Sequence, residues 1–369
     1  MAIANIRATW HAPPADNESG RNAREFGMKL SALDDRPESW CWHLLGLCNP
    51  LIVIGGNLAG GLWTAAGMVF MLGLGPVLDV ILGQADKPRP ARASGTPYAV
   101  LLYAHAALQL VAVGTLLWLA VRQGFSWSVI AAAVSTGINS GASGLIVAHE
   151  LGHTRPGSIS WWVGRLNLLT VLYLHFTTEH NHTHHRYVAT TADPATARLG
   201  ESVWWFIART VPAQFVDAWR IHARKGRPPA TNPVAQGMVL QVALLIGIGW
   251  TCGPPAMAAF LLQAASAIFL LEYINYLRHY GLERALGDRQ EPWHSWQAEQ
   301  RWSRWTLLEL TRHPAHHLKA SEPFWRLQPH PDAPSLPNGY YGCFWPTLVP
   351  PLWRRLIHPR LPSQGNTKA

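Results

Sequence analysis

The stretch EHNHTHH, which begins at Glu179, contains four histidines: His180, His182, His184 and His185. Imidazole binds transition metals such as iron, copper, nickel and zinc. Two histidines at positions i and i+4 of a helix lie on one face, close enough to bind one ion. His180 and His184 have this spacing, whereas His182 is two residues from each and is turned away by a helix. The stretch alone fits either a metal site or a histidine-rich polar loop, and the rest of the sequence decides between them.

Three further groups, AHELGH, NYLRHYG and TRHPAHH, add histidines with related spacing. The first holds a pair at i and i+4, the last holds three on one helical face, and the histidine of NYLRHYG closes an apolar segment. One tetrahedral zinc uses at most four ligands. A set of this size therefore predicts two ions with four or five ligands each. The candidate ligands are His149, His153, His180, His184, His185, His279, His313, His316 and His317.

Other polar residues in or beside these groups are weaker candidates. Their side chains could hydrogen-bond the ligating imidazoles and fix the ring tautomers, although a solvated loop or a helix cap is the alternative for each carboxylate. These second-layer candidates are Glu150, Glu179, Asp193, Glu272, Asn275, His175, His182 and His294. His43 and His105 lie inside apolar segments, where we expect hydrogen-bonded packing residues.

The elements that must position these histidines are membrane helices. Only 14% of the residues are charged, well below the ~25% of soluble proteins, and four long segments have no charge. They lie between Glu38 and Asp79, Arg92 and Arg122, Arg122 and Glu150, and Arg227 and Glu272. A membrane helix needs ~20 apolar residues, so these segments accommodate two, one, one and two spans. The sequence therefore predicts an all-α integral membrane protein with about six transmembrane helices, broken at glycines 55–61 and at the GPP of 253–255.

The distribution of basic residues predicts the orientation. With six spans, the N-terminus, segments 83–97 and 148–235 and everything after about 275 share one side and carry nearly all of them, and the opposite side receives only Arg122. The positive-inside rule then places both termini and the histidine-rich region in the cytoplasm. The expected organisation is a polar N-terminal segment 1–38, a membrane domain 39–360 and a short tail 361–369. The net charge of +9 fits attraction to anionic lipid, and no basic stripe with interleaved aromatic residues indicates nucleic-acid binding.

In their order, HELGHT, EHNHTHH, NYLRHYG and LTRHPAHH resemble the motifs of the bacterial membrane alkane hydroxylases (alkane 1-monooxygenases). This family belongs to the membrane fatty acid desaturase and hydroxylase superfamily. VATTADPATARLGES (188–202), WHSW (293–296) and PSLPNGYYGCF (334–344) extend the resemblance. It implies a multi-pass enzyme of the bacterial inner membrane, with a cytoplasmic di-iron region in which the nine histidines hold two irons. Such an enzyme uses O2 to hydroxylate an unactivated, terminal C–H bond of an alkane or similar apolar molecule taken from the bilayer.

An electron donor is also expected. The chain has no dinucleotide-binding glycine fingerprint, and its four scattered cysteines cannot hold an iron–sulfur centre. The resemblance implies a rubredoxin, or a ferredoxin, and its NAD(P)H-dependent reductase. Exposed basic residues could steer an acidic carrier to the cytoplasmic face. The candidates are Arg209, Arg220, Arg224, Lys225, Arg227, Arg354, Arg355 and Arg360.

Four departures from the motifs leave the substrate class and the redox tuning open. Thr154, Thr183, Arg278 and the pair 314–315 (Pro-Ala) stand where the family has Lys, Gly, Glu and Ser-Asp. Within the superfamily, the alternative is a fatty-acyl or terpenoid hydroxylase or desaturase. HELGH also matches the H-E-x-x-H signature of an intramembrane zinc protease, with Glu150 as its general base. A transporter is disfavoured, because the histidines are expected at one membrane surface instead of near the midplane of the bilayer. The small residues of 135–144 are typical of close helix packing.

Overall fold

The computed structural model describes residues 38–90 and 94–362, so that segment 1–38 and tail 361–369 lie almost wholly outside it. Within the described part, secondary structure is helical, apart from two isolated β-bridges that pair Gln84 with Gln300 and Gln297 with Ser335. The predicted all-α class is confirmed.

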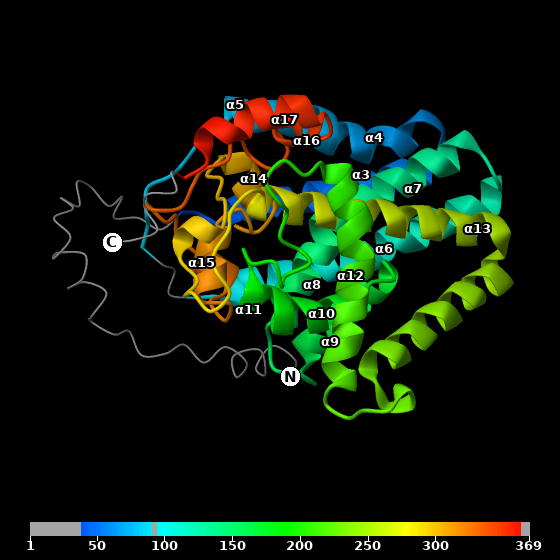
Figure 1. The fold of residues 1–369 in the computed structure, drawn as a ribbon. Helices are drawn as coiled ribbons and strands as arrows, with labels where there is room; N and C mark the ends of the chain where they lie inside the picture. The colour runs from blue at the N-terminus through cyan, green and yellow to red at the C-terminus, as the bar shows by residue number, and fades with distance from the viewer. Residues whose placement is uncertain (1–37, 91–93, 363–369) are drawn as a thin grey trace.

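Five helical stretches are long and apolar enough to cross a membrane. Several are composite, because 3-10 or π turns interrupt the α-helix. They are Trp40–Ala59 (η1 Trp40–Leu47, α3 Cys48–Ala59), Gly61–Ile81 (η2 Gly61–Ala65, α4 Ala66–Met68, η3 Val69–Leu74, α5 Gly75–Ile81), α6 (Thr96–Gln123), Trp127–Gly152 (α7 Trp127–Asn139, η4 Ser140–Gly144, α8 Leu145–Gly152) and α13 (Pro233–His279). In Figure 1 the long helices α6, α7 and α13 run side by side. The chain is a membrane protein.

Both predicted breaks between helices are present. Gly60 and Gly61 have φ of 74° and 55° where the first stretch ends and the second begins. Gly253 has φ of 83° and kinks the 47-residue α13, and a positive φ of this kind is readily adopted only by glycine. Each limb of α13 is about as long as the ~20 residues that a span requires. Counting the limbs as two spans gives the predicted total of six, which stays a prediction.

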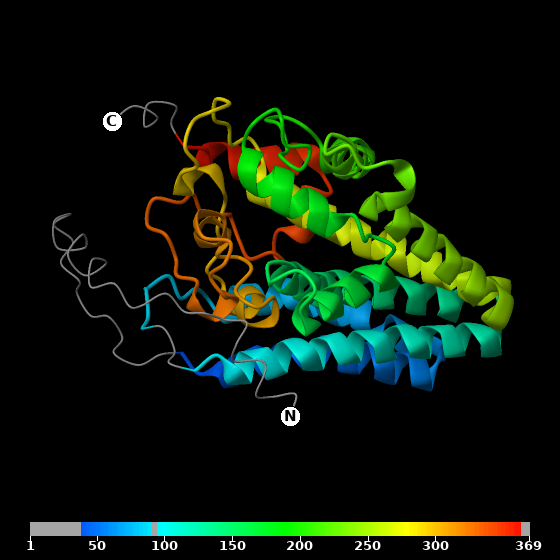
Figure 2. The same cartoon turned by 90° about the horizontal axis from the view of Figure 1, so that it is seen from below.

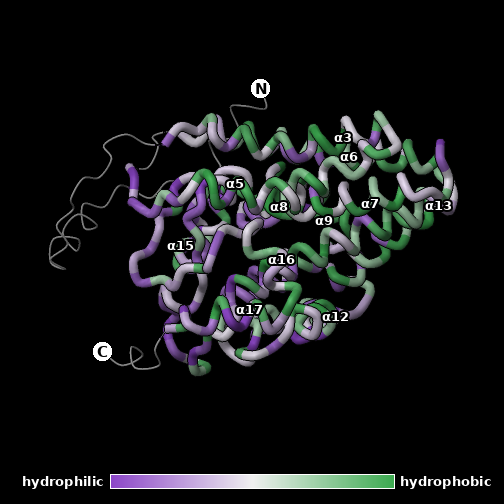
Figure 3. Tube along the Cα trace, turned by 90° about the horizontal axis from the view of Figure 1, so that it is seen from above, coloured by the Kyte–Doolittle hydropathy of each residue, from purple (hydrophilic) through white to green (hydrophobic). Residues whose placement is uncertain are grey.

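Shorter helices gather mainly at one end of the long ones (Figures 1 and 2). Figure 3 shows that hydrophilic residues are concentrated around α15, whereas hydrophobic residues predominate along α6, α7 and α13. This polar end carries most of the histidine motifs. The remaining elements are α9 (Ile159–Thr170), α10 (Phe176–Glu179), η5 (His180–His184), α11 (His185–Tyr187), α12 (Val203–Ala223), η6 (Pro229–Thr231), η7 (Pro292–His294), α14 (Arg301–Thr306), α15 (His313–Leu318), η8 (Phe324–Arg326), α16 (Phe344–Thr347), α17 (Pro350–Ile357) and η9 (His358–Arg360).

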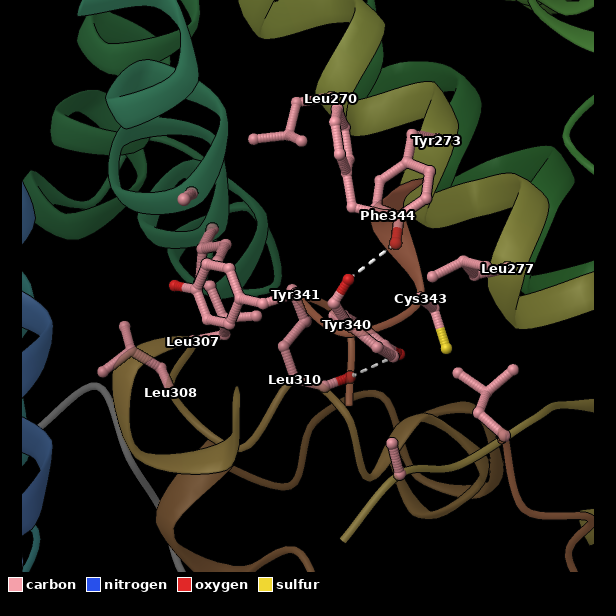
Figure 4. Packing of buried hydrophobic residues seen from close by; sticks show 14 of the residues in the cluster. Leu270, Tyr273, Leu277, Leu307, Leu308, Leu310, Tyr340, Tyr341, Cys343 and Phe344 are labelled. Carbon is pink, nitrogen blue, oxygen red and sulfur yellow. Dashed lines mark hydrogen bonds between the residues drawn. The ribbon is translucent and has the colours of Figure 1, made fainter. Parts of the chain in front are cut away.

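Close helix packing around α7 and η4 agrees with the interpretation of the small residues. A Cβ added to Gly137 would lie 2.5 Å from the carbonyl oxygen of Gln263 in α13, and one added to Gly141 would lie 2.8 Å from Leu270. Beyond this contact, the loop 340–344 packs against α13 (Figure 4). There the Tyr273 hydroxyl donates to the Tyr340 carbonyl oxygen over 2.6 Å.

Candidate metal centre

The nine candidate ligands come together as two neighbouring groups. In each group, one ring nitrogen per histidine lies within 4.8 Å of all the others. The groups adjoin, since the rings of His185 and His317 have centroids 4.7 Å apart. The five-histidine group is His149, His153, His180, His185 and His316, and the four-histidine group is His184, His279, His313 and His317.

A π turn changes how the EHNHTHH histidines are divided. The backbone N–H of His185 donates to the carbonyl oxygen of His180, which is the i→i+5 bond of a π-helix. His180 and His185 therefore fall in one group, with their Nε2 atoms 3.0 Å apart, and His184 falls in the other. The expectation that His180 and His184 serve one ion through i, i+4 spacing was wrong, because it assumed a regular α-helix.

The other spacings also contribute to both groups. His149 and His153 share a group, as their i, i+4 spacing predicted, and so do His313 and His317. His316 lies on the same short helix as His313 but joins the five-histidine group. The helix α15 thus supplies histidines to both groups, and so does the EHNHTHH segment. The same two segments therefore position both groups.

The donor set fits metal ions. His149 has no hydrogen-bond partner on either ring nitrogen, and His153 and His184 have none on Nε2, although an orphaned buried nitrogen is costly. Burial, followed by the charge of His184, lowers the pKa of His153 to about 4. Burial also holds the pKa of His185 well below its usual range, which favours the neutral imidazole that ligates metal. With metal–nitrogen bonds of ~2.1 Å, two ligands lie at most ~4.2 Å apart, so small inward movements would close each group.

Two second-layer contacts reach the four-histidine group. His184 Nδ1 donates to Asp193 Oδ2 over 2.9 Å, and Asp193 also accepts from the Ala195 backbone and the Thr196 hydroxyl. His279 Nδ1 lies 3.4 Å from the carbonyl oxygen of His294. Asp193 is thus placed as expected for a residue that fixes a tautomer, whereas His294 contributes its backbone instead of its ring.

Among the described residues, none of the other second-layer candidates forms a hydrogen bond with a candidate ligand. The buried Glu150 carboxylate accepts from the Phe324 backbone N–H over 3.0 Å, and Oε1 of the buried Glu179 has no partner. Glu272 accepts from Tyr173, Gln214 and Asn275 in a polar cluster. His175 packs against Tyr173 and Phe215. His182 is exposed, as predicted from its position two residues from His180 and His184.

A buried ion network behind α15 was not found by sequence reasoning. Arg304 donates to Glu309 over 2.8 Å and Arg312, which precedes the ligand candidate His313, donates to Glu299 over 2.9 Å. His43 Nε2 lies 3.1 Å from Glu309, which makes it the hydrogen-bonded packing residue we expected. These partners are far apart in the sequence, so spacing gave no signal for them.

An apolar cavity reaches the five-histidine group. Its empty volume is about 660 Å³, a figure that includes space open to the outside. Its lining includes the apolar side chains of Met71, Leu270 and Phe344 together with His149 and His180 of the five-histidine group. Figure 4 shows how four of the lining residues, Leu270 and Tyr273 of α13, Tyr340 and Phe344, lie relative to one another. The arrangement can hold an apolar molecule against the candidate metal site and exclude water.

Comparisons with known proteins match the chain to families of desaturases and monooxygenases. The family model described as fatty acid desaturase matches residues 125–347. The chain is 35% identical over 346 residues to alkane 1-monooxygenase 1 of Pseudomonas aeruginosa, which covers 87% of this chain and 90% of the relative. It is 32% identical over 364 residues to an alkane 1-monooxygenase of Pseudomonas putida, covering 92% and 90%. The hydroxylase component of the xylene/toluene monooxygenase of Pseudomonas putida is 32% identical over 228 residues, 59% of this chain and 60% of that protein.

Proposed function

Because the chain belongs to the alkane 1-monooxygenases within the membrane fatty acid desaturase superfamily and is an oxidoreductase of that kind, we propose that it is a di-iron hydroxylase of apolar molecules. One observation carries the proposal: two groups of histidines meet the end of an apolar cavity. Iron suits imidazole ligands and supports oxygen chemistry. The zinc-protease alternative is disfavoured, because the Glu150 carboxylate that would serve as base is engaged by the Phe324 backbone.

Each part of the chain has a role in this proposal. The nine histidines would hold two irons, which when bound supply O2 activation and the insertion of one oxygen atom into a C–H bond. Asp193 holds the Nδ1 proton of His184, so that Nε2 faces the metal position. The cavity orients a medium-length apolar chain from the bilayer and excludes water from the reacting carbon. For an alkane bound in this cavity, we expect the reaction at a terminal carbon, as the name of the alkane 1-monooxygenases states.

The proposed setting is the bacterial inner membrane, with the histidine region in the cytoplasm. Relatives of this kind imply an electron-transfer partner, and we assign that role to a rubredoxin or ferredoxin with its NAD(P)H-dependent reductase. Hydroxylation needs two electrons beyond those that the C–H bond supplies. A cytoplasmic carrier can reach a metal centre at the cytoplasmic helix ends.

The metal assignment is tested by iron analysis of purified variants. His184 and His316 lie in different groups, so we expect His184→Ala and His316→Ala each to abolish turnover and lower the iron content from about two to about one per chain. His182→Ala is the matched control, because His182 belongs to the same histidine-rich segment but is exposed, and it should keep both irons. Full activity in either ligand variant would remove the site assignment.

A further inference from the structure

Arg278 is a buried cation without a counter-ion. Its residue is 2% exposed, and its position in NYLRHYG is the one where the resembled family has Glu. Nε donates to the Tyr340 hydroxyl over 3.1 Å, and the guanidinium lies 5.6 Å from the centroid of that ring. Nη2 is buried and has no hydrogen-bond partner. Among the described residues, none of the ion pairs includes Arg278.

Tyr340 does not neutralise this charge. Its hydroxyl donates onward to the Leu310 carbonyl oxygen over 3.4 Å (Figure 4), so it serves Arg278 only as a neutral acceptor. A buried charge is costly unless it is paired. The surroundings increase this cost, because metal ions bound to the nearby histidines would add further positive charge. A negative partner must therefore come from outside the described residues.

The place of Arg278 indicates where that partner binds. Arg278 lines the same cavity as His149 and His180 and directly precedes His279 of the other histidine group. The remaining walls are largely apolar, with Ile146, Leu270 and Phe344 among them. From Arg278 to Leu270 the helix rises ~12 Å at 1.5 Å per residue. A ligand that satisfies both ends has one anionic group and a medium-length apolar body.

We propose that Arg278 binds the carboxylate of an apolar carboxylic acid, which is a substrate of the hydroxylation assigned above. The planar guanidinium suits a carboxylate, because two parallel N–H groups can donate to its two oxygens. The acid lies with its carboxylate at the histidine end and its tail toward Leu270, so the oxidised carbon is near the carboxylate. The inference rests on the proposed function for the reaction, but not for the binding.

The reaction balances with the electron donor already named. One C–H bond of the acid is replaced by C–OH, with the inserted atom from O2. The second oxygen atom leaves as water, with two electrons from the iron–sulfur carrier and two protons from solvent. The carboxylate is unchanged and stays bound to Arg278 during the reaction.

Binding without turnover is the first test. The full chain in nanodiscs, without reductant, is titrated with decanoate, 1-decanol and formate, and the shift in Tm gives each Kd. We expect decanoate to bind more tightly than 1-decanol, and Arg278→Gln to weaken decanoate between about tenfold and a hundredfold, as for loss of a charged hydrogen bond. Arg278→Lys should restore part of the affinity. Arg289→Gln removes an 88% exposed charge and should change nothing, which controls for partition of decanoate into lipid.

Turnover is the second test. The wild-type ratio of kcat/KM for decanoate to that for decane should fall in Arg278→Gln, and the hydroxylated carbon of decanoate should lie near the carboxylate. Four results would each overturn the inference. They are equal binding of decanoate and 1-decanol, decanoate binding that Arg278→Gln does not weaken, formate binding as tight as that of decanoate, and hydroxylation of decanoate at the carbon farthest from the carboxylate. Arg278-dependent decanoate binding without oxidation of any substrate would instead overturn the proposed function and support the binding site.

Discussion

At the scale of single residues, one contact within 38–90 and 94–362 joins a candidate ligand to a carboxylate by a hydrogen bond, that of His184 with Asp193. Asp193→Asn replaces the acceptor of the His184 Nδ1 proton by an amide that can present N–H instead. We expect iron affinity and turnover to fall by about 10–100-fold, the usual effect of losing such a partner. Iron retention during chelator challenge, together with kcat, measures the change.

The control for this variant is Asp332→Asn, since the Asp332 side chain is 68% exposed and pairs with His330, which is not a candidate ligand. It should keep wild-type iron retention. If Asp193→Asn held its irons as firmly as the control, Asp193 would be only a loop-forming residue that accepts from Ala195 and Thr196.

Residue type and spacing were sufficient to find all nine histidines of the two groups, because a ligand set must be made of the right side chains. They were not sufficient to divide the set. The division depends on the i→i+5 bond between His180 and His185, and nothing in EHNHTHH separates a π turn from an α turn. Arg278 was recognised only as a departure from a motif, since its missing counter-ion is visible only when its neighbours are known.

At the scale of elements, the contact of α7 with α13 sets the distance between helices that carry ligands. Gly137→Ala would place a Cβ 2.5 Å from the backbone oxygen of Gln263, which cannot move without displacing α13. We expect a loss of about 1–3 kcal/mol in the free energy of unfolding, as for other overpacked sites, and a lower Tm in detergent. Loss of iron should accompany it, because Trp127–Gly152 and α13 carry His149 and His279.

Gly114→Ala provides the matched comparison in α6. An added Cβ there meets nothing within 4 Å. The substitution should therefore leave the free energy of unfolding unchanged or raise it by up to about 1 kcal/mol through reduced chain entropy, and Tm should not fall. Equal effects of the two substitutions would mean that the close approach of α7 to α13 is not a tight contact. The small residues predicted this contact, but the sequence could not identify α13 as the partner, because its apolar residues are spread around the whole helix.

At the scale of the whole molecule, the basic residues are distributed so that one part of the surface is suited to an acidic carrier. Arg220, Arg224, Lys225 and Arg227 are exposed at the end of α12 and after it. Arg209 is different from the prediction, because it is paired with Glu201 over 2.9 Å. The pKa of His222 is lowered by burial, then by Lys225 and Arg227, and then by His182. These basic residues therefore lie near His182, on the exposed side of the segment that carries His180 and His184.

Electron delivery should depend on this patch, which we define as Arg224, Lys225 and Arg227. We expect the triple substitution of these residues by Glu to raise the KM for the reduced iron–sulfur carrier by about tenfold or more at low salt, because charge complementarity governs the rate of encounter. The difference from wild type should shrink as ionic strength rises, since the Debye length falls to ~8 Å at 0.15 M. Iron content should not change, since none of the three contributes to the histidine groups.

Arg122→Glu is the control for this experiment, because Arg122 lies in the last turn of α6, on the side of the predicted membrane opposite to the histidines, where it stacks over Trp118. Turnover is measured with NADH, reductase and carrier across a salt series, and with the carrier omitted. A triple variant that keeps wild-type KM and salt dependence would assign the patch to anionic lipid and direct the search for the docking surface to Arg354, Arg355 and Arg360. Sustained turnover without any added carrier would contradict the need for a separate iron–sulfur protein itself.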